Sequence, residues 1–120
     1  MLIQNIKSYD DFTNYMNTYK YIIVNISASW CQPCISIKPH IEKFVSVIVD
    51  ENDENKFIYL KIDNSVYEKY VEFEKFFKIN KIPYFGFIKN NKIVDAFVSG
   101  DFKFVSKKIF DNISNEKDLS

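Results

Sequence analysis

Hydrophobic and polar positions along the chain follow two different periods, which predict strands and helices in alternation. Runs rich in β-branched and aromatic residues are typical of strands. They cover residues 2–6, 20–27, 57–62, 82–88 and 93–98. The run 20–27 shows no polar alternation before Asn25, as expected of a central strand buried on both faces. We therefore expect the amide of Asn25 to find a hydrogen-bond partner inside the sheet.

Apolar residues that recur every three or four positions predict the helices. These segments are residues 9–19, 33–48, 67–77 and 104–113. Ser8 is expected to cap the first helix, and Ser65 with Glu68 forms a capping-box pattern for the third. Pro39 lies inside the second helix and should kink it. The tail, residues 114–120, is expected to fray.

The connections complete the predicted order of elements. The acidic stretch 50–55 predicts a solvated loop, and residues 89–92 predict a hairpin turn in which asparagine tolerates positive φ. Glu74 and Lys78 are spaced to pair on the third helix. The order β, α, β, α, β, α, β, β, α predicts a parallel sheet with helices on both faces and an antiparallel hairpin at one edge. Residues 1–120 are expected to form a single domain.

Composition and charge restrict the classes of function. The 120 residues are 47% hydrophobic, which is ample for one core, and 16 basic residues balance 16 acidic ones. A formal net charge of zero argues against nucleic-acid binding driven by bulk charge. No apolar stretch approaches the roughly 20 residues of a membrane helix, and the first residues do not resemble a signal peptide. We therefore expect no membrane association and a cytoplasmic, reducing location.

The chemistry is concentrated in Trp30-Cys31-Gln32-Pro33-Cys34, which holds the only two cysteines and the only tryptophan. This stretch lies where a predicted buried strand gives way to a helix. The first N–H groups of a helix lack partners and carry partial positive charge, so they favour a thiolate at Cys31. In such a setting the pKa of a cysteine can fall from near 8.5 to roughly 3.5–7.5. Cys34 would follow one turn later, within disulfide reach.

Three other interpretations of the cysteine pair compete with redox chemistry. A structural disulfide is one, although a bridge across so short a loop constrains the unfolded chain little. A zinc site is another, but zinc takes about four ligands and the chain offers two cysteines and His40 alone. The third is a pair of inert core cysteines. We expect His40 to be exposed or capping and no metal to be bound.

The order of elements together with Trp30-Cys31-Gln32-Pro33-Cys34 resembles the thioredoxin family over nearly the whole chain. The resemblance extends to Pro39, to Leu60-Lys61-Ile62-Asp63, to Ile82-Pro83 and to Ser99-Gly100. It implies an α/β thioredoxin fold, in which a central mixed sheet is flanked by helices on both faces. It also implies that Pro83 is cis and faces the cysteines.

The same resemblance implies a function. Cys31 and Cys34 would be catalytic, with no cofactor, in a monomer that reduces disulfide-containing protein substrates. A thioredoxin reductase or another dithiol donor would restore the dithiol. The substrate groove would be framed by Trp30, Gln32, Pro33, Ile82, Pro83 and Gly100. Two alternatives stay open: an activity like that of a protein disulfide isomerase or oxidase, and a non-catalytic interaction module with this fold.

The chain also departs from the family's pattern. Gln32 stands where glycine is usual between the cysteines. Asn25 replaces the family's buried aspartate, and Tyr59 takes the position of the lysine that usually neighbours it. We therefore expect both ends of that ion pair to be absent. The segment from Asp63 to Pro83 is also longer than usual.

Overall fold

The computed structural model describes residues 1–49 and 56–118, so the predicted acidic loop 50–55 lies outside the described residues. The elements, in order, are β1 (Leu2–Asn5), α1 (Tyr9–Thr18), β2 (Tyr21–Ser27), α2 (Gln32–Ile48), β3 (Phe57–Asp63), α3 (Asn64–Lys69), α4 (Val71–Phe77), β4 (Tyr84–Lys89), β5 (Lys92–Val98) and α5 (Phe102–Asp118). The predicted alternation of strands and helices is confirmed, with changes in two segments that are described below.

The strands form one five-stranded mixed sheet in the order β1-β3-β2-β4-β5. β1, β3 and β2 run parallel, β4 is antiparallel to β2, and β5 is antiparallel to β4. β1 is an edge strand, and the predicted C-terminal antiparallel hairpin is confirmed. Asn90 and Asn91 adopt φ of 51° and 66° at the hairpin turn, as expected for asparagine in a two-residue loop.

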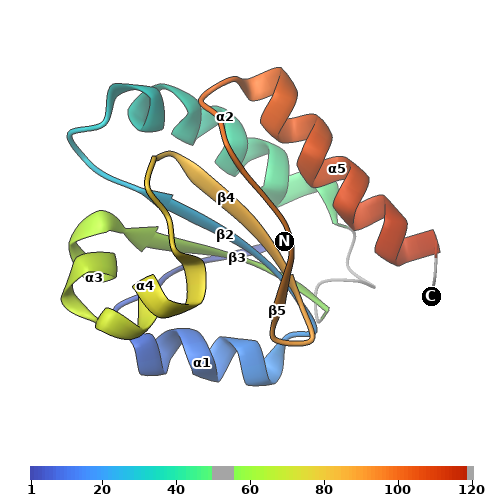
Figure 1. The fold of residues 1–120 in the computed structure, drawn as a ribbon. Helices are drawn as coiled ribbons and strands as arrows, with labels where there is room; N and C mark the ends of the chain where they lie inside the picture. The colour runs from blue at the N-terminus through green and yellow to red at the C-terminus, as the bar shows by residue number, and fades with distance from the viewer. Residues whose placement is uncertain (50–55, 119–120) are drawn as a thin grey trace.

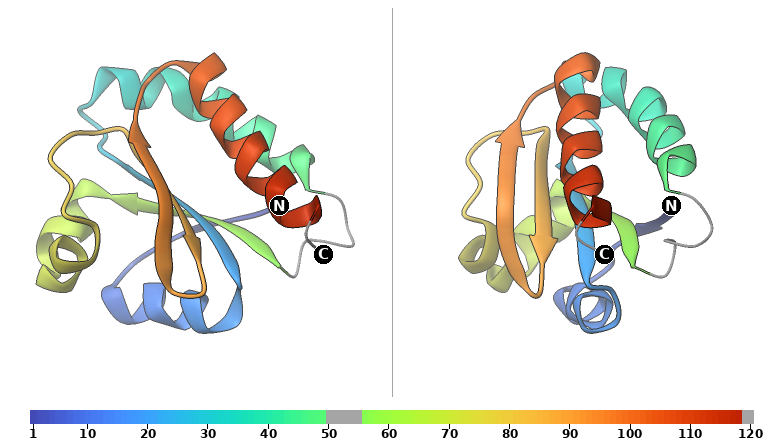
Figure 2. Two further views of the ribbon diagram at one scale, coloured as in Figure 1. Left: turned by 45° about the vertical axis from the view of Figure 1, so that its right-hand side comes forward. Right: turned by 90° about the vertical axis from the view of Figure 1, so that its right-hand side faces the viewer.

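Helices cover both faces of the sheet (Figure 1). α2 and α5 lie on one face, and α1, α3 and α4 lie on the other, as the turned views in Figure 2 show. Each face has its own hydrophobic cluster. Val45 and Val105 pack with Ile23 under α2 and α5, while Phe12 and Phe73 are fully buried under the other helices. β2 lies between both clusters, which agrees with its prediction as a strand buried on both faces.

The helix predicted over residues 67–77 differs in the structure. The segment begins earlier and is divided into α3 and α4 at Tyr70, whose backbone is extended. Asp63 caps α3 by accepting the N–H of Ser65 at 2.9 Å, so the predicted Ser65–Glu68 capping box is wrong. Lys78 leaves the helix in the left-handed conformation at φ 53°. It is therefore the end of α4 and not the helical partner of Glu74.

The C-terminal helix is also longer than predicted. α5 runs from Phe102 to Asp118, whereas the sequence pattern predicts residues 104–113 followed by a frayed tail. Glu116 explains part of the extension, because its carboxylate forms a 3.0 Å ion pair with Lys89 at the end of β4. Asp95 on β5 is similarly paired to Lys108, at 3.0 Å. The two ion pairs tie α5 to the hairpin along its length.

Candidate functional site

The two cysteines lie at the start of α2, directly after the loop that follows β2. Cys31 is the N-cap residue, with extended backbone, and its sulfur accepts the backbone N–H of Cys34 at 3.4 Å. Pro33 occupies the first turn, where its missing N–H costs no helical hydrogen bond. The expected placement of Cys31 at the mouth of a helix is therefore confirmed. A negative charge on this sulfur would face a backbone N–H and the positive end of the helix dipole.

Cys31 and Cys34 are joined in a disulfide, with 5.3 Å between their Cα atoms. The pair is not two separately packed thiols. Both residues are buried, and with Ala28 they form a small cluster against which Ile82 packs. Among the residues that the structure describes, no group of three or more histidine, cysteine or acidic side chains could hold a metal ion.

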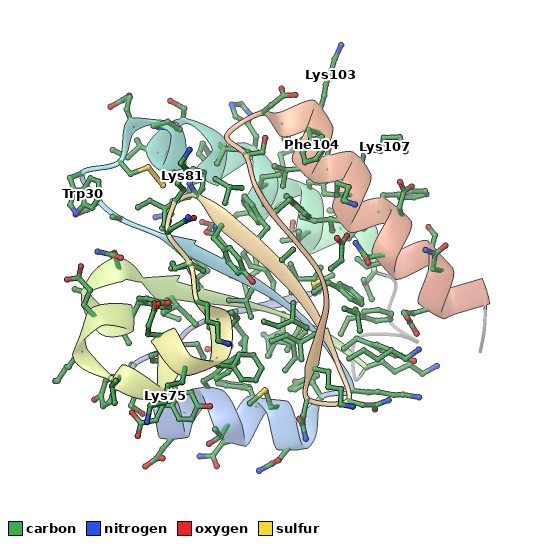
Figure 3. The ribbon with its side chains drawn as sticks, in the orientation of Figure 1. Trp30, Lys75, Lys81, Lys103, Phe104 and Lys107 are labelled. Atoms are coloured by element: carbon green, nitrogen blue, oxygen red, sulfur yellow. A yellow bond between two sulfur atoms is a disulfide. The ribbon has the colours of Figure 1, made fainter. Side chains whose placement is uncertain are left out.

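Trp30 forms the exposed side of the site. Its side chain is 72% exposed, and Figure 3 shows it at the tip of the loop before α2, on the same side of the molecule as Lys81. Gln32 and Pro33 are exposed beside it. An exposed indole combines a large apolar face with an N–H donor, which is why tryptophan is enriched at protein interfaces. The site is therefore a buried disulfide next to an exposed aromatic platform.

The segment before β4 supplies the opposite side of the site. The Ile82–Pro83 peptide bond is cis, as the resemblance implied, and Ile82 packs against the cysteine cluster. The carbonyl of Pro83 accepts the N–H of Ser99 at 3.2 Å, which ties this segment to the end of β5. Ile82 thus lies against the cysteine cluster, and the backbone bond of Pro83 connects this segment to the loop that contains Gly100.

Gly100 lies against the first turn of α2, and this approach is possible because glycine has no side chain. A Cβ atom added to Gly100 would lie 2.9 Å from the Cβ of Pro33, closer than real side chains pack. Glycine is therefore required here by the close approach of the loop after β5 to the first turn of α2. This contact joins Gly100 to the cysteine loop.

A cavity of about 320 Å³ lies beside Cys34. Its lining residues are Asn5, Asn25, Ser27, Ala28, Ser29, Cys34, Ile35, Lys38, Lys61 and Asp63. Asn25 donates its amide to the carbonyl of Tyr84 at 3.3 Å, so the polar side chain expected in the central strand does find a partner. The cavity is partly open to solvent and large enough for several water molecules, and its lining includes polar groups such as those of Asn25 and Lys61.

Lys61 is the residue of this cavity that the sequence analysis missed. The ion pair beside Asn25 was expected to be absent because Tyr59 takes the position of its lysine, and Tyr59 is indeed buried in the core. However, Lys61 is the register partner of Asn25 on β3 and brings a lysine back to the cavity. Its ammonium forms a 2.9 Å ion pair with Glu42 of α2. The register between β2 and β3 could have identified Lys61. Pairing Ile26 with Ile62 on the neighbouring strand places Asn25 beside Lys61.

A second hollow, of about 420 Å³, lies beside Trp30 and Ile82 and is walled by α3, α4 and the segment after α4. The side chain of Tyr67 is part of the lining of this hollow. Its hydroxyl donates to the carboxylate of Glu74 and accepts the N–H of Ile79 at 3.3 Å. Burial, followed by the hydrogen bond to Glu74, raises the pKa of Tyr67 to about 12. Tyr67 thereby links both parts of the broken helix to the segment that leads to Ile82.

His40 lines neither of the two hollows beside the cysteines. It is exposed on α2, as expected, and its ring lies 5.9 Å from that of Phe102. In the described part of the chain, no helix is long and apolar enough to span a membrane.

Comparisons with known proteins agree with this geometry. The family model described as Thioredoxin matches residues 4–113. A thioredoxin of Malassezia sympodialis is 30% identical over 99 residues, which cover 82% of this chain and 88% of that protein. A thioredoxin of Coprinus comatus is 29% identical over 100 residues, covering 83% and 88% of the two chains.

Solved structures resemble the fold as a whole. The crystal structure of the Malassezia sympodialis thioredoxin matches with a TM-score of 0.71 at 28% identity, covering 91% of each chain. A thioredoxin structure from Plasmodium falciparum matches with a TM-score of 0.74, covering 91% of this chain and 97% of that one. At 22% identity the second match bears on the fold alone.

Proposed function

The chain belongs to the thioredoxin family and has its fold, and we propose that it reduces disulfides in target proteins through Cys31 and Cys34. Members of this family are thiol–disulfide oxidoreductases, and the close cysteine pair of this chain is consistent with that chemistry. We add that electrons pass from the Cys31–Cys34 dithiol to the target disulfide, and we assign a role to each sulfur. It also assigns a docking surface.

The observation that carries the proposal is the hydrogen bond from the backbone N–H of Cys34 to the sulfur of Cys31. In the reduced protein the same N–H would stabilise a thiolate on Cys31, because hydrogen bonds to the charged form of a group favour that form. The thiolate is the nucleophile in thiol–disulfide exchange. Cys31 is thus the attacking residue and Cys34 the resolving one.

Reduction of a target then takes two exchanges. The Cys31 thiolate attacks one sulfur of the target disulfide, and the other target sulfur leaves as a thiolate that takes up a proton. Cys34 loses its proton and attacks the Cys31 sulfur, which breaks the mixed disulfide and releases the second target thiol. Two electrons pass from the Cys31–Cys34 dithiol to the target, and the protein is left in the disulfide form.

The docking surface in this proposal is made of Trp30, Gln32, Pro33, Ile82, Pro83 and Gly100. Trp30 offers an exposed apolar face beside the disulfide. An extended stretch of the target could add main-chain hydrogen bonds at Ile82, in the manner of strand addition. Because this rim is open, it fits a protein substrate with an accessible disulfide better than it fits a small molecule that needs an enclosed site.

The oxidised protein needs an electron donor to act again. We propose a thioredoxin reductase or another dithiol donor for this step, acting on the same sulfur atoms. A reducing compartment such as the cytoplasm would favour reduction over oxidation. The protein is proposed to act as a monomer.

Insulin reduction in the presence of dithiothreitol tests the proposal. We expect precipitation of the insulin B chain faster than in the uncatalysed control, and no acceleration by the Cys31→Ser variant. A wild-type protein that performs no better than Cys31→Ser would refute the reductase function. The Lys107→Met variant, altered on an exposed turn of α5, should retain full activity and controls for handling of variants.

The reduction potential of the Cys31–Cys34 pair tests the direction. A value near −270 mV, roughly that of thioredoxins, supports a reductase, and a value near −180 mV, roughly that of protein disulfide isomerase, supports the alternative. Unchanged binding to a partner after both cysteines are replaced by serine would instead favour an interaction module.

A further inference from the structure

The hollow beside Trp30 contains a hydrogen-bonded tyrosine that the two-exchange scheme does not use. Tyr67 is buried on α3. Its side chain lines this hollow, as do those of Trp30, Ile79 and Ile82. Trp30 and Ile82 belong to the proposed docking surface, whereas Tyr67 and Ile79 do not. The hollow, of about 420 Å³, therefore connects the docking surface to the two short helices α3 and α4.

The hydroxyl of Tyr67 bridges two interruptions of the helical backbone. It donates to the carboxylate of Glu74 on α4, and it accepts the backbone N–H of Ile79 at 3.3 Å. The first interruption is Tyr70, where the backbone is extended, and the second is Lys78, where it is left-handed. The bond to Glu74 spans the first interruption, and the bond to Ile79 spans both. One side chain on α3 thus holds α4 and the chain that leaves it.

The bond to Ile79 fixes one end of the docking segment, which is the chain from Ile79 to Pro83 that leads from α4 to β4 (Figure 1). At the other end, the carbonyl of Pro83 accepts the N–H of Ser99. Between the two ends, Ile82 packs against the cysteine cluster. Within the described part of the chain, the backbone of residues 80–82 makes no hydrogen bond of its own. The backbone at Ile82 is therefore free to pair with a target, and its hydrogen-bonded anchors lie at the two ends of the segment.

We propose that Tyr67 is a positioning residue for target docking, because its hydroxyl holds the docking segment in the conformation in which the backbone at Ile82 can pair with an extended target chain. This inference rests on the proposed function. Without the hydroxyl, the N–H of Ile79 loses its acceptor and the segment keeps its hydrogen bond at Pro83 alone. A looser segment must be ordered each time a target binds, and this ordering weakens binding. A small disulfide that does not pair with Ile82 is unaffected.

Kinetics with two substrates test the proposal. Tyr67→Phe should raise the KM for insulin severalfold with little change in kcat, and should leave the rate with a small aromatic disulfide close to that of the wild type. The pKa of Cys31 should also stay unchanged, because the N–H of Cys34 that faces its sulfur is not altered. A purely structural role would instead lower the amount of folded protein and reduce the rates with both substrates together.

Tyr70→Phe is the matched control, because it removes a hydroxyl from the same pair of helices at a residue whose side chain makes no capping hydrogen bond to α4. Glu74→Gln keeps an oxygen that can accept the Tyr67 hydroxyl and should retain most of the wild-type KM, whereas Glu74→Leu should raise it. The two Glu74 variants keep the test decisive if Tyr67→Phe fails to fold. An insulin KM that is unchanged in Tyr67→Phe and Glu74→Leu, or raised as much by Tyr70→Phe, would overturn the proposal.

Formation of the mixed disulfide provides a second measurement that needs no turnover. In the Cys34→Ser variant, adding Tyr67→Phe should slow the reaction of Cys31 with insulin severalfold and leave its reaction with the small disulfide unchanged. If the wild type fails to reduce insulin but this selective slowing is observed, the reductase function is refuted and the role of Tyr67 in docking stands. If the wild type reduces insulin without selective slowing in the variant, the function stands and this inference is refuted. Failure of Cys31 to form any mixed disulfide with insulin would refute both.

Discussion

Gly100 and Pro33 approach so closely that the space between them admits no further atom. A Cβ on Gly100 would lie 2.9 Å from the Cβ of Pro33. This contact brings the loop after β5 against the first turn of α2, beside the disulfide. The shape of the proposed groove therefore depends on the close approach of these two backbone segments as well as on the side chains around it.

Gly100→Ala tests this contact. The added methyl group must push the loop away from Pro33, at a cost of about 1–3 kcal/mol in folding free energy if the loop resists. We expect the KM for insulin to rise severalfold, because the rim is displaced. The rate with a small aromatic disulfide, which needs little of the rim, should change less. Equal kinetics for both substrates, unchanged from the wild type, would show that the contact has no functional importance.

Trp30→Ala separates docking from stability. Because the indole is 72% exposed, its removal should change the free energy of unfolding by less than about 0.5 kcal/mol. Reduction of insulin should nevertheless weaken, mainly through KM. Urea unfolding and insulin kinetics on the same sample measure the two effects. A large loss of stability without a kinetic effect would mean that Trp30 is a structural residue.

Tyr67→Phe tests the hydroxyl that links α3, α4 and the segment leading to Ile82. Its loss leaves the N–H of Ile79 without that acceptor, which should cost about 1–3 kcal/mol in urea unfolding at neutral pH. Tyr19→Phe, a change at the half-buried end of α1, is the matched control and should cost little. Equal stabilities for the two variants would rule out this role of the hydroxyl.

The alkaline pH dependence of stability follows from the same hydroxyl. The pKa of Tyr67 in the folded protein is raised to about 12, above its ordinary value of 10.0. Folding therefore favours the protonated form, and this contribution is complete below pH 10.0 and is lost as pH rises through about 12. We expect the stability difference between the wild type and Tyr67→Phe to shrink over that range. A difference that grows with pH would contradict the assigned direction.

Asp95 is expected to make the stability of the fold depend on pH in the acid range, where stability falls as pH falls. Burial alone would raise the pKa of Asp95, but the hydrogen bonds from Asn112 and Lys108 and the charge of Lys108 outweigh it and hold the pKa below 3.8. The stabilisation is thus present above the unfolded value and is lost as pH falls through the lower folded value. Urea unfolding of Asp95→Asn at several pH values should show a stability deficit that is constant near neutral pH and disappears in strong acid. A deficit independent of pH down to the acid range would count against the ion pair with Lys108.

Much of the fold could be predicted because its signals are local. The strand 20–27, the turn at Asn90 and Asn91, and the position of Cys31 at a helix start each depend on residues near one another in sequence. The division of α3 from α4 was missed because the aromatic spacing continues through Tyr70, although the backbone there is extended. Tertiary bonds of Tyr67 to Glu74 and Ile79 accompany that break, and helical periodicity does not report them.

The site was predictable to a similar degree and for a similar reason. Cys31 and Cys34 are only three positions apart in sequence, so their pairing needed no knowledge of the sheet. Lys61 was missed because its place beside Asn25 follows from the register between two parallel strands. Matching the family pattern by sequence position assigned the place of the family's lysine to Tyr59. It could not show that Lys61, two residues later on the same face of β3, lines the cavity.

The pKa of Cys31 in the reduced protein is the measurement on which the account depends most directly. It can be obtained from the pH dependence of alkylation in the Cys34→Ser variant, which retains the backbone N–H that faces the Cys31 sulfur. The account predicts a pKa no higher than about 7.5, below the value of about 8.5 for a free cysteine. A pKa at or above about 8.5 would show that the start of α2 does not activate this sulfur, and would contradict the proposed mechanism.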